Sequence, residues 1–302
     1  MLKSQMTINV MALLTLALFW SSSVPAIKIA VEISGPISLV AVRGCVGFVV
    51  VLALVQLAGK LEWRPYLRYV PYIFVMSIVG MSLPFYLISR AELVLESSLT
   101  GLLMSVGPLL TILGAHFFLQ NERMTTASVV GVLTGFAGVA LLLGKGATTA
   151  SYATIEAQIS VMFATGCYVV GNLMARRIAE VPPLFMSLAM LIFLVVQMMP
   201  LALWLERPDF ASWPADVWGA AVWLGLFSTG LAFSLRYYLI RHAGAGFTAY
   251  VGYLIPMFSV VLGALILNET LSSEKLIAVA LIIAGLGISQ NWMRRNKSIV
   301  NK

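Results

Sequence analysis

The sequence predicts an all-α, polytopic membrane protein in which ten transmembrane helices form two inverted five-helix repeats. Three observations predict this fold class: the chain is strongly apolar, uncharged intervals long enough to cross a bilayer recur along it, and its two halves resemble one another. Of the 302 residues, 60% are hydrophobic and 10% are charged, and the mean hydropathy is +0.96. These values lie far from those of soluble globular domains.

The first half of the chain contains five intervals that can each cross a hydrocarbon core, which takes a helix of about 20 residues. They are residues 4–27, 33–59, 69–89, 97–121 and 124–144, and the second of them contains one charge, Arg43. The first interval also resembles a signal peptide, because Lys3 precedes an apolar run and Ser-Val-Pro-Ala follows it. Its match to an internal helix of the second half, which cannot be cleaved, favours a membrane span.

The second half contains five more intervals, residues 157–175, 181–205, 217–235, 242–268 and 276–293, of which the fourth begins with His242. Short connections join all ten intervals and leave no room for a soluble domain of ordinary size. Cys45 and Cys167 both fall within intervals. A structural disulfide of the secreted kind is therefore not indicated, and both cysteines are expected to be small packing residues.

The net charge of +7 comes from basic residues spread over the connections. With a cytoplasmic N-terminus, five basic residues fall at outer ends: Lys28, Arg90, Lys145, Arg207 and Lys275. Thirteen fall inside: Lys3, Lys60, Arg64, Arg68, Arg123, Arg176, Arg177, Arg236, Arg241, Arg294, Arg295, Lys297 and Lys302. This bias predicts a multi-pass protein of the cell inner membrane with both termini cytoplasmic. The basic balance thus indicates topology, and no nucleic-acid partner is expected.

The two halves match at a spacing of 147 residues. The matched pairs are Pro36 with Pro183, Glu122 with Glu269, Ala137 with Ala284 and Gly138 with Gly285. The match slips by one residue between Pro108 and Glu122 relative to Pro256 and Glu269. Each unit, residues 1–145 and 146–302, would contain five helices, and an odd number makes the second unit enter the membrane from the opposite side. Inverted repeats with a site at their interface are a recurring plan of secondary transporters.

The sequence resembles the EamA family of the drug/metabolite transporter superfamily over roughly residues 8–143 and 155–292. The resemblance is carried by Phe19-Trp20-Ser-Ser-Ser, by Ala41-Val-Arg43-Gly and by the two proline-to-glutamate stretches. It implies a ten-helix bundle that moves small organic solutes, often outward, through a central cavity between the halves. The second unit departs from the pattern, because Cys167 stands opposite Trp20 and Met190 opposite Arg43.

Arg43 is a cation inside an apolar interval, where charge is costly and must face protein, water or a partner. One interpretation is that it holds a substrate carboxylate or sets a positive potential in the cavity. The other is that it braces helices by bonding to carbonyl groups at a broken turn. The two are not exclusive.

Prolines within the intervals remove backbone donors and free the carbonyl group four residues earlier. We expect Pro25, Pro108 and Pro256 to act as hinges for alternating access, and Pro84 frees the carbonyl of Gly80 in the same way. The alternative is a static kink that a hydroxyl group satisfies.

Aromatic residues and methionines recur on the helices that the resemblance places at the cavity. The predicted substrate-binding residues are Trp20, Ser22, Arg43, Tyr86, Met104, Tyr168, Tyr250 and Tyr253, and Phe85 belongs to the same aromatic set. They would form a pocket for a partly apolar solute. Any single aromatic residue could instead face lipid or the membrane interface.

No Asp or Glu lies at the centre of any interval, which weakens a proton-relay mechanism. Glu92 and Glu96 are placed in the connection between the third and fourth intervals, and His116 is read as a helix-end hydrogen bonder. Glu122 and Glu269 are expected to cap the helices that follow them.

These features favour a secondary transporter of small organic metabolites, with amino acids or related amphiphiles as substrates and export as the direction. Metalloprotease, serine hydrolase and Walker A motifs are absent, so an enzyme, a metal, a cofactor and direct use of ATP are not expected. A passive uniporter or channel-like facilitator remains the alternative. The lipid bilayer and a small-molecule substrate are the expected partners, and the protein would act as a monomer or homodimer.

Overall fold

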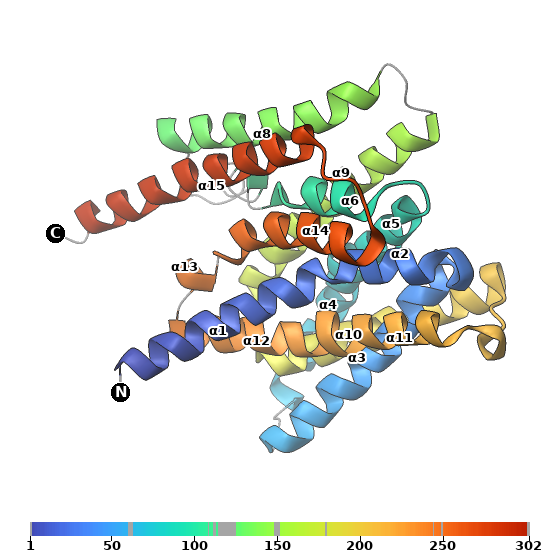
Figure 1. Ribbon diagram of the computed structural model, residues 1–302. Coiled ribbons are helices and arrows are strands. Elements are labelled where there is room, and N and C mark those ends of the chain that lie inside the picture. Colours follow the sequence, from blue (N-terminus) through green and yellow to red (C-terminus); the bar gives the residue numbers. More distant parts are fainter. Residues whose placement is uncertain are drawn as a thin grey trace.

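The computed structural model describes residues 2–59, 63–107, 109–110, 113, 125–147, 152–178, 180–243, 245–248 and 250–300. These residues are almost entirely helical and contain no strand. Figure 1 shows a bundle of roughly aligned helices with the two ends of the chain on the same side. The all-α prediction is confirmed.

The first half begins with α1 (Leu2–Ser21) and α2 (Ser23–Ser34), which meet at Ser22 and are followed by α3 (Pro36–Ala58). The next helical run joins a 3-10 turn η1 (Arg64–Tyr69), α4 (Val70–Ser77), a π-helical segment η2 (Ile78–Ser82) and α5 (Leu83–Glu92). The helices α6 (Ser97–Met104) and α8 (Thr126–Ala147) complete this half.

The second half begins with α9 (Tyr152–Arg177), and α10 (Pro183–Leu201) then continues into a π-helical segment η3 (Ala202–Glu206). After a short 3-10 turn η4 (Phe210–Ser212), one run joins α11 (Ala215–Trp223), a π-helical segment η5 (Leu224–Leu231) and α12 (Ala232–Ala243). The last helices are α13 (Ala245–Thr248), α14 (Val251–Leu267) and α15 (Ser273–Val300).

Within the described residues, six helical runs are long and apolar enough to cross a membrane: Gln5–Ser34, Pro36–Ala58, Arg64–Glu92, Tyr152–Ala175, Pro183–Glu206 and Ala215–Arg236. Two shorter apolar helices, Thr126–Leu142 and Leu254–Leu267, match two more predicted intervals, and α15 covers residues 276–293. Interval 97–121 begins with α6, and its residues 108, 111–112 and 114–121 lie outside the described part of the chain. The helix of the first interval does not end at Lys28, because α2 continues to Ser34.

Proline explains the π-helical segment in the third run. Pro84 has no N–H to bond to Gly80, and the amide of Leu83 bonds five residues back, to the carbonyl of Ile78. Gln197 of α10 stabilises this widened turn from outside: its Nε2 donates to Ser77 Oγ at 2.9 Å, and its Oε1 accepts from Ser82 Oγ at 2.6 Å.

The helices of the two halves are interleaved rather than side by side. In the tertiary contacts α3 packs against α10 and η5, α5 against α9, α2 against α11, α1 and α6 against α14, and α8 against α15. Figure 1 shows α8 and α15 running together along one flank. We call the end where α2 and α5 end and α3, α6 and α11 begin the distal end, and the end that holds the N-terminus of α1 the proximal end.

A carboxylate joins the halves at the distal end. Glu206 accepts hydrogen bonds from the backbone amides of Ile37 and Ser38, at 2.9 and 2.7 Å, and from the Ser38 hydroxyl. A negative charge there suits the unsatisfied amides at the start of α3. Gly35 precedes them with φ of +76°, a conformation that favours glycine, and a Cβ on it would displace the Glu206 carboxylate, which would lie 2.5 Å away.

Candidate functional site

A cavity of about 260 Å³ lies between the two halves, in the middle of the bundle. Its walls come from both halves and are mostly apolar, with a few polar and charged groups. The lining residues are Trp20, Ser23, Val24, Ile27, Arg43, Met76, Gly80, Phe85, Ile88, Gly101, Met104, Tyr168, Gly171, Asn172, Ala175, Met186, Met190, Ser228, Phe233, Arg236 and Ile255. An apolar pocket with few convergent polar groups is typical of a small-molecule site.

Arg43 projects from α3 into this cavity and is 6% exposed. Its Nε donates to the Thr229 hydroxyl at 2.7 Å, and Thr229 in turn donates to the Leu224 carbonyl within η5. The guanidinium carbon lies 3.8 Å from the centroid of the Phe85 ring. Arg43 therefore braces a π-helical segment through one nitrogen, and Thr229 is its only hydrogen-bond partner among the residues that the structure describes.

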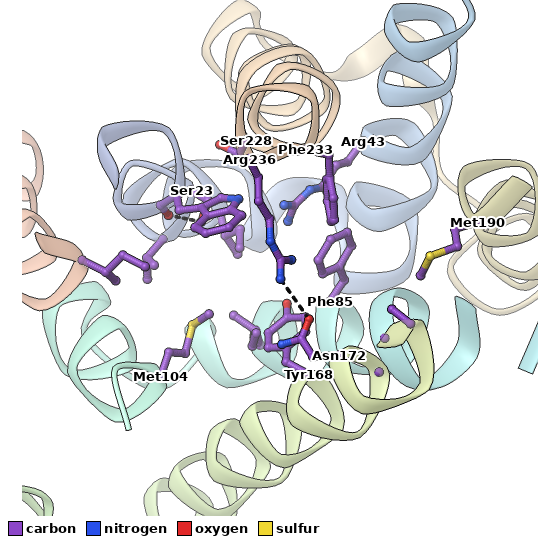
Figure 2. Close-up of a pocket in the computed structure, with 18 of the residues that line it drawn as sticks. Ser23, Arg43, Phe85, Met104, Tyr168, Asn172, Met190, Ser228, Phe233 and Arg236 are labelled. Atoms are coloured by element: carbon purple, nitrogen blue, oxygen red, sulfur yellow. Dashed lines mark hydrogen bonds between the residues drawn. The ribbon is translucent and has the colours of Figure 1, made fainter. Parts of the chain in front are cut away.

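A second arginine, Arg236 of α12, reaches the same cavity. Its terminal nitrogen donates to Asn172 Oδ1 at 3.4 Å, and its guanidinium lies 5.9 Å from the Trp20 ring centroid. Figure 2 shows Arg43 and Arg236 projecting into the same space, with Tyr168 and Asn172 facing them. No Asp or Glu is among the described lining residues, so the cavity carries a net positive charge.

Aromatic and small residues shape the rest of the wall. Phe85 and Tyr168 are in edge-to-face contact, with centroids 6.3 Å apart, which is a favourable arrangement for two rings. Beside them η2 and α9 approach closely, because a Cβ on Gly171 would lie 2.8 Å from the Gly80 Cα. The two glycines thus let helices from different halves touch where both border the cavity.

Four of the eight residues predicted to bind substrate line the cavity: Trp20, Arg43, Met104 and Tyr168. Three others do not line it. Ser22 accepts a hydrogen bond from Trp223 Nε1 and donates to the Phe19 carbonyl, Tyr86 lies a position beyond Phe85, and Tyr250 packs with Phe247. The side chain of Tyr253 lies outside the described part of the chain.

Two of the three predicted hinges lie close together. Pro25 is in the first turn of α2, directly after the helix break at Ser22, and Pro256 is inside α14. The hydroxyl of Ser21 donates to the carbonyl of Ile255 at 3.2 Å, which ties the two proline segments to each other. Pro108 lies outside the described residues.

Arg236 and Asn172 were missed by the prediction. The sequence assigned Arg236 to a cytoplasmic connection because the uncharged interval stops at residue 235, whereas α12 continues to Ala243. One signal was available: Thr229 and Arg236 are seven residues apart and share a helix face, as do Tyr168 and Asn172, four apart.

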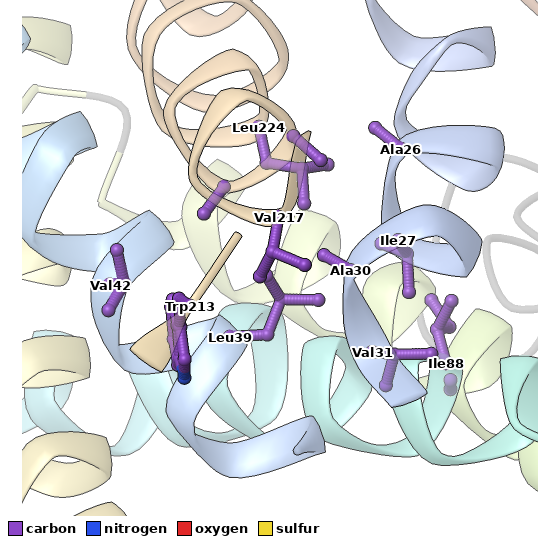
Figure 3. Packing of buried hydrophobic residues seen from close by; sticks show 13 residues of the cluster. Ala26, Ile27, Ala30, Val31, Leu39, Val42, Ile88, Trp213, Val217 and Leu224 are labelled. Atoms are coloured by element: carbon purple, nitrogen blue, oxygen red, sulfur yellow. The ribbon is translucent and has the colours of Figure 1, made fainter. Parts of the chain in front are cut away.

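An apolar layer closes the distal end. Ile27, Ala30 and Val31 of α2 pack with Leu39 and Val42 of α3, with Ile88 of α5, and with Trp213, Val217 and Leu224 of the second half. Figure 3 shows these side chains gathered in the space between the helices. Ile27 and Ile88 also line the cavity, so this layer forms its distal wall and separates it from the solvent beyond.

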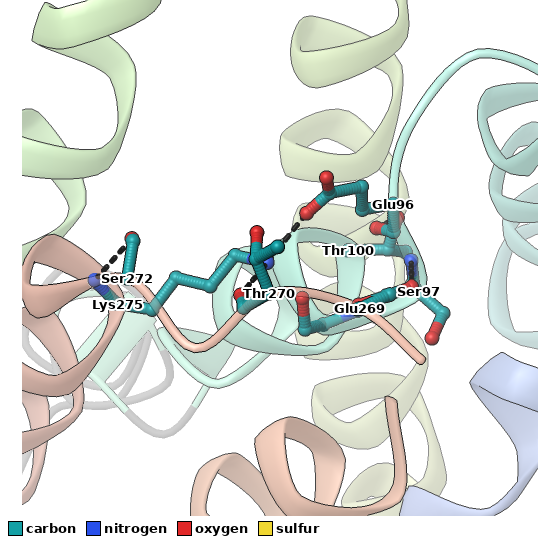
Figure 4. Close-up of polar contacts among 8 residues, drawn as sticks. Glu96, Ser97, Thr100, Glu269, Thr270, Ser272 and Lys275 are labelled. Atoms are coloured by element: carbon teal, nitrogen blue, oxygen red, sulfur yellow. Dashed lines mark hydrogen bonds and ion pairs between the residues drawn. The ribbon is translucent and has the colours of Figure 1, made fainter. Parts of the chain in front are cut away.

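Polar contacts join the start of α6 to the segment between α14 and α15 at the distal end, and we call this contact region the distal rim (Figure 4). Glu269 accepts hydrogen bonds from the backbone amides of Ser97 and Ser98, at 2.7 and 2.9 Å, and Lys275 pairs with Glu96 at 2.5 Å. Glu269 therefore caps α6 of the first half, and the expectation that it caps the following helix is wrong. This capping requires α6 and α14 to be adjacent, and the local sequence does not show that they are. Glu122 lies outside the described residues.

A bundle of apolar, membrane-length helices around a mostly apolar cavity that two arginines enter is typical of multi-pass membrane transport proteins. The model of the EamA-like transporter family matches residues 7–144 and 156–289. The chain belongs to this family, whose members are transporters of the drug/metabolite type.

Relatives carry transporter names rather than enzyme names. An "Uncharacterized transporter" of Archaeoglobus fulgidus is 23% identical over 89% of this chain and 94% of its own length. A "Probable terminal-alkyne amino-acid exporter" of Streptantibioticus cattleyicolor is 29% identical over 92% and 91%. The "Aromatic amino acid exporter YddG" of Ancylobacter novellus is 29% identical over 65% and 67%. One crystal structure covers 96% of this chain and 99% of its own, with a TM-score of 0.69 and 22% identity, so the fold is shared.

Proposed function

We propose that the protein is a secondary transporter that exports small organic metabolites with a carboxylate and an apolar or aromatic body, such as amino acids and related amphiphiles. Its substrate would bind in the central cavity between two inverted five-helix units, residues 1–145 and 146–302. Access would alternate between the proximal end, facing the cytoplasm, and the distal end, facing the outside of a cell inner membrane.

The proposed substrate class is based on one observation: two guanidinium groups face a cavity whose described lining holds no acid. Arginine presents planar donors that match a carboxylate in two-point contact. Arg43 uses one nitrogen on Thr229 and leaves its others for a ligand. The Phe85, Tyr168 and Trp20 rings would cover the apolar body of the solute, and Met104 and Met190 could adapt to its shape.

The paired element bounds support the inverted repeat. Pro36 begins α3 and Pro183 begins α10, 147 residues later, and Thr126 begins α8 while Ser273 begins α15 at the same spacing. The π-helical segments η2 and η5 also begin 146 residues apart, at Ile78 and Leu224. Five helices per unit, ten in all, is the arrangement that these pairs favour.

The printed names of two relatives, both amino-acid exporters, favour export and amino acid-like substrates. The distribution of basic residues favours a cytoplasmic proximal end, because more Lys and Arg lie on that side. A passive uniporter is the second candidate, and the absence of an acid from the described cavity lining favours it, since a carboxylate is the side chain that most often binds a coupled proton or cation in a membrane.

A resistance screen tests the proposal. Cells that overproduce the protein are challenged with toxic amino acids, aromatic carboxylic acids and matched amines or esters that lack the carboxylate. We expect resistance to carboxylated compounds only, and loss of that resistance in Arg43→Gln produced at equal level in the membrane. Equal resistance to the esters, or resistance unchanged in Arg43→Gln, would remove the arginines from substrate recognition.

Reconstituted vesicles then separate the two mechanisms. The identified solute is loaded inside, and its efflux is measured with and without an imposed pH gradient. A secondary active transporter moves solute against its own gradient when the pH gradient is present, whereas a uniporter only equilibrates it.

A further inference from the structure

Glu92 is an unexplained buried acid at the distal end of α5. The sequence places it in the outer connection between the third and fourth intervals, whereas in the structure it is the last residue of α5 and its exposed fraction is 0%. Among the residues that the structure describes, neither carboxylate oxygen has a hydrogen-bond partner. The nearby Thr100 hydroxyl instead donates to the Glu96 carbonyl, at 3.2 Å.

Such a carboxyl group fits its site only when neutral. A carboxylate that is buried without hydrogen bonds loses a large favourable hydration free energy. The protonated acid loses much less of it on burial. Lys28 is the neighbouring cation, but its ammonium donates to the backbone carbonyl of Glu92, at 2.6 Å. The cation thus anchors α2 to the end of α5 and gives the carboxylate no direct partner.

The charged and titratable groups on the packed elements confirm that no ion pair neutralises Glu92 within the described residues. Lys28 is on α2, Arg43 is on α3 beside Phe85, Arg90 of α5 pairs with Glu156 of α9, and Glu96 before α6 pairs with Lys275. Glu269, after α14, is held by the amides of α6 and adds a further negative charge.

The position of Glu92 connects it to the closure of the cavity. Phe85, Ile88 and Glu92 lie on one face of α5, at spacings of three and four residues, and the first two line the cavity. A second cavity of about 260 Å³ opens at the distal end between Lys28, Val94, Leu95, Glu96, Leu267 and Glu269. This cavity is close to Glu92 along the chain, because Val94 lies two residues after it and the Lys28 ammonium bonds to the Glu92 carbonyl.

We propose that Glu92 is a proton-binding site whose occupancy stabilises the arrangement in which the distal end is closed. One proton from the distal solution adds to the carboxylate as α2, α5 and α6 close, and the resulting neutral acid is buried. When the distal end opens, the acid meets water beside the Lys28 ammonium, returns its proton to the distal solution and becomes an anion. The inference rests on the proposed alternating access, and it makes substrate release depend on the pH of the distal side.

Infrared difference spectroscopy tests the site without any substrate. Purified protein in lipid is compared with Glu92→Gln at neutral pH, and Glu96→Gln, an exposed and paired acid, is the matched control. We expect the carbonyl band of a protonated carboxyl group in the difference for Glu92→Gln and none for Glu96→Gln. If Glu92→Gln does not fold, Glu92→Asp shifts the same band. Carboxylate bands alone in the difference would overturn the proposal.

Efflux from vesicles tests the consequence. For the wild type, acidifying the distal side should slow release by up to about tenfold per pH unit over which the site titrates, because one proton is bound. Glu92→Gln should release substrate independently of that pH. A sodium-dependent stabilisation that Glu92→Gln removes would overturn the proposal, since the site would then bind a metal ion. Failure to transport any tested solute, with the infrared band present, would instead refute the proposed function alone.

Discussion

The guanidinium carbon of Arg43 lies 3.8 Å from the centroid of the Phe85 ring, so that a cation of α3 rests on an aromatic face of α5. Thr229 holds the same arginine from the second half. The charge is thereby fixed at one point of the cavity wall by two helices, which orients the remaining guanidinium nitrogens toward the cavity.

Replacing Phe85 with Leu should weaken substrate binding while the protein still folds. A buried cation–π contact contributes about 1–2 kcal/mol, and its loss would let the Arg43 guanidinium move. We expect the apparent affinity for a carboxylated solute to fall by about tenfold, measured by competition for uptake into vesicles. Phe193→Leu, which alters a ring pair with Phe74 that does not line the cavity, is the control and should transport normally.

Arg236→Gln should reduce transport of solutes with an anionic group. The substitution removes one of two positive charges from the cavity and keeps a side chain that can still bond to Asn172. We expect at least about a tenfold loss of affinity, the effect of ~1.4 kcal/mol, in the same competition measurement. The control is Arg177→Gln, since Arg177 is exposed on α9 and does not line the cavity. Equal losses in both variants would point to membrane insertion rather than binding.

Gly171→Ala should destabilise the bundle, because its Cβ would lie 2.8 Å from the Gly80 Cα and the two helices would have to separate. Overpacking of this kind costs about 1–3 kcal/mol. Gly166→Ala, on the same helix, is the control, since no atom lies within 4 Å of its added Cβ. We expect a lower thermal transition for the first variant and an unchanged or higher one for the second. Identical transitions would mean that the helices do not touch here.

Glu269 should make the stability of the distal rim depend on pH. Partial burial raises the pKa of its carboxyl group, but the hydrogen bonds from Ser98 and Ser97 lower it by more, so the pKa lies below its ordinary value. The stabilisation is therefore complete above the ordinary carboxyl pKa and is lost as the pH falls through the lowered value.

The Glu269→Gln variant tests this linkage. At neutral pH it should be about 1 kcal/mol less stable, the usual contribution of a helix N-cap, as measured by thermal unfolding in detergent. The difference from the wild type should shrink as the pH is lowered into the acid range. Glu180→Gln, at an exposed pair with Arg68, should change stability little. A difference that does not vary with pH would contradict the assignment.

The apolar intervals predicted most of the helices. In lipid a chain segment must make its backbone hydrogen bonds internally, so a long run without charge is expected to be helical. Their ends were less predictable. Lys28 and Arg236 lie inside helices although charge marked both positions as boundaries, since each finds partners on a neighbouring helix: the Glu92 carbonyl and Asn172.

The candidate site was predictable in part. Arg43 and Trp20 stood out as a cation and a large aromatic residue beside hydroxyl groups, and both line the cavity. Ser22 and Tyr86 were indistinguishable from their neighbours Ser23 and Phe85, which line the cavity instead, because a rotation of about 100° per residue separates adjacent side chains.

The sequence by itself determined that the chain is a helical membrane protein of the EamA type, because hydropathy and short motifs are properties of the chain read along its length. Tertiary structure alone decided that Arg43 and Arg236 face one cavity, that Glu269 caps α6 and that Glu92 is buried. These arrangements depend on contacts between residues that lie 64 to 186 positions apart along the chain. Only the packing of helices from both halves brings such residues together.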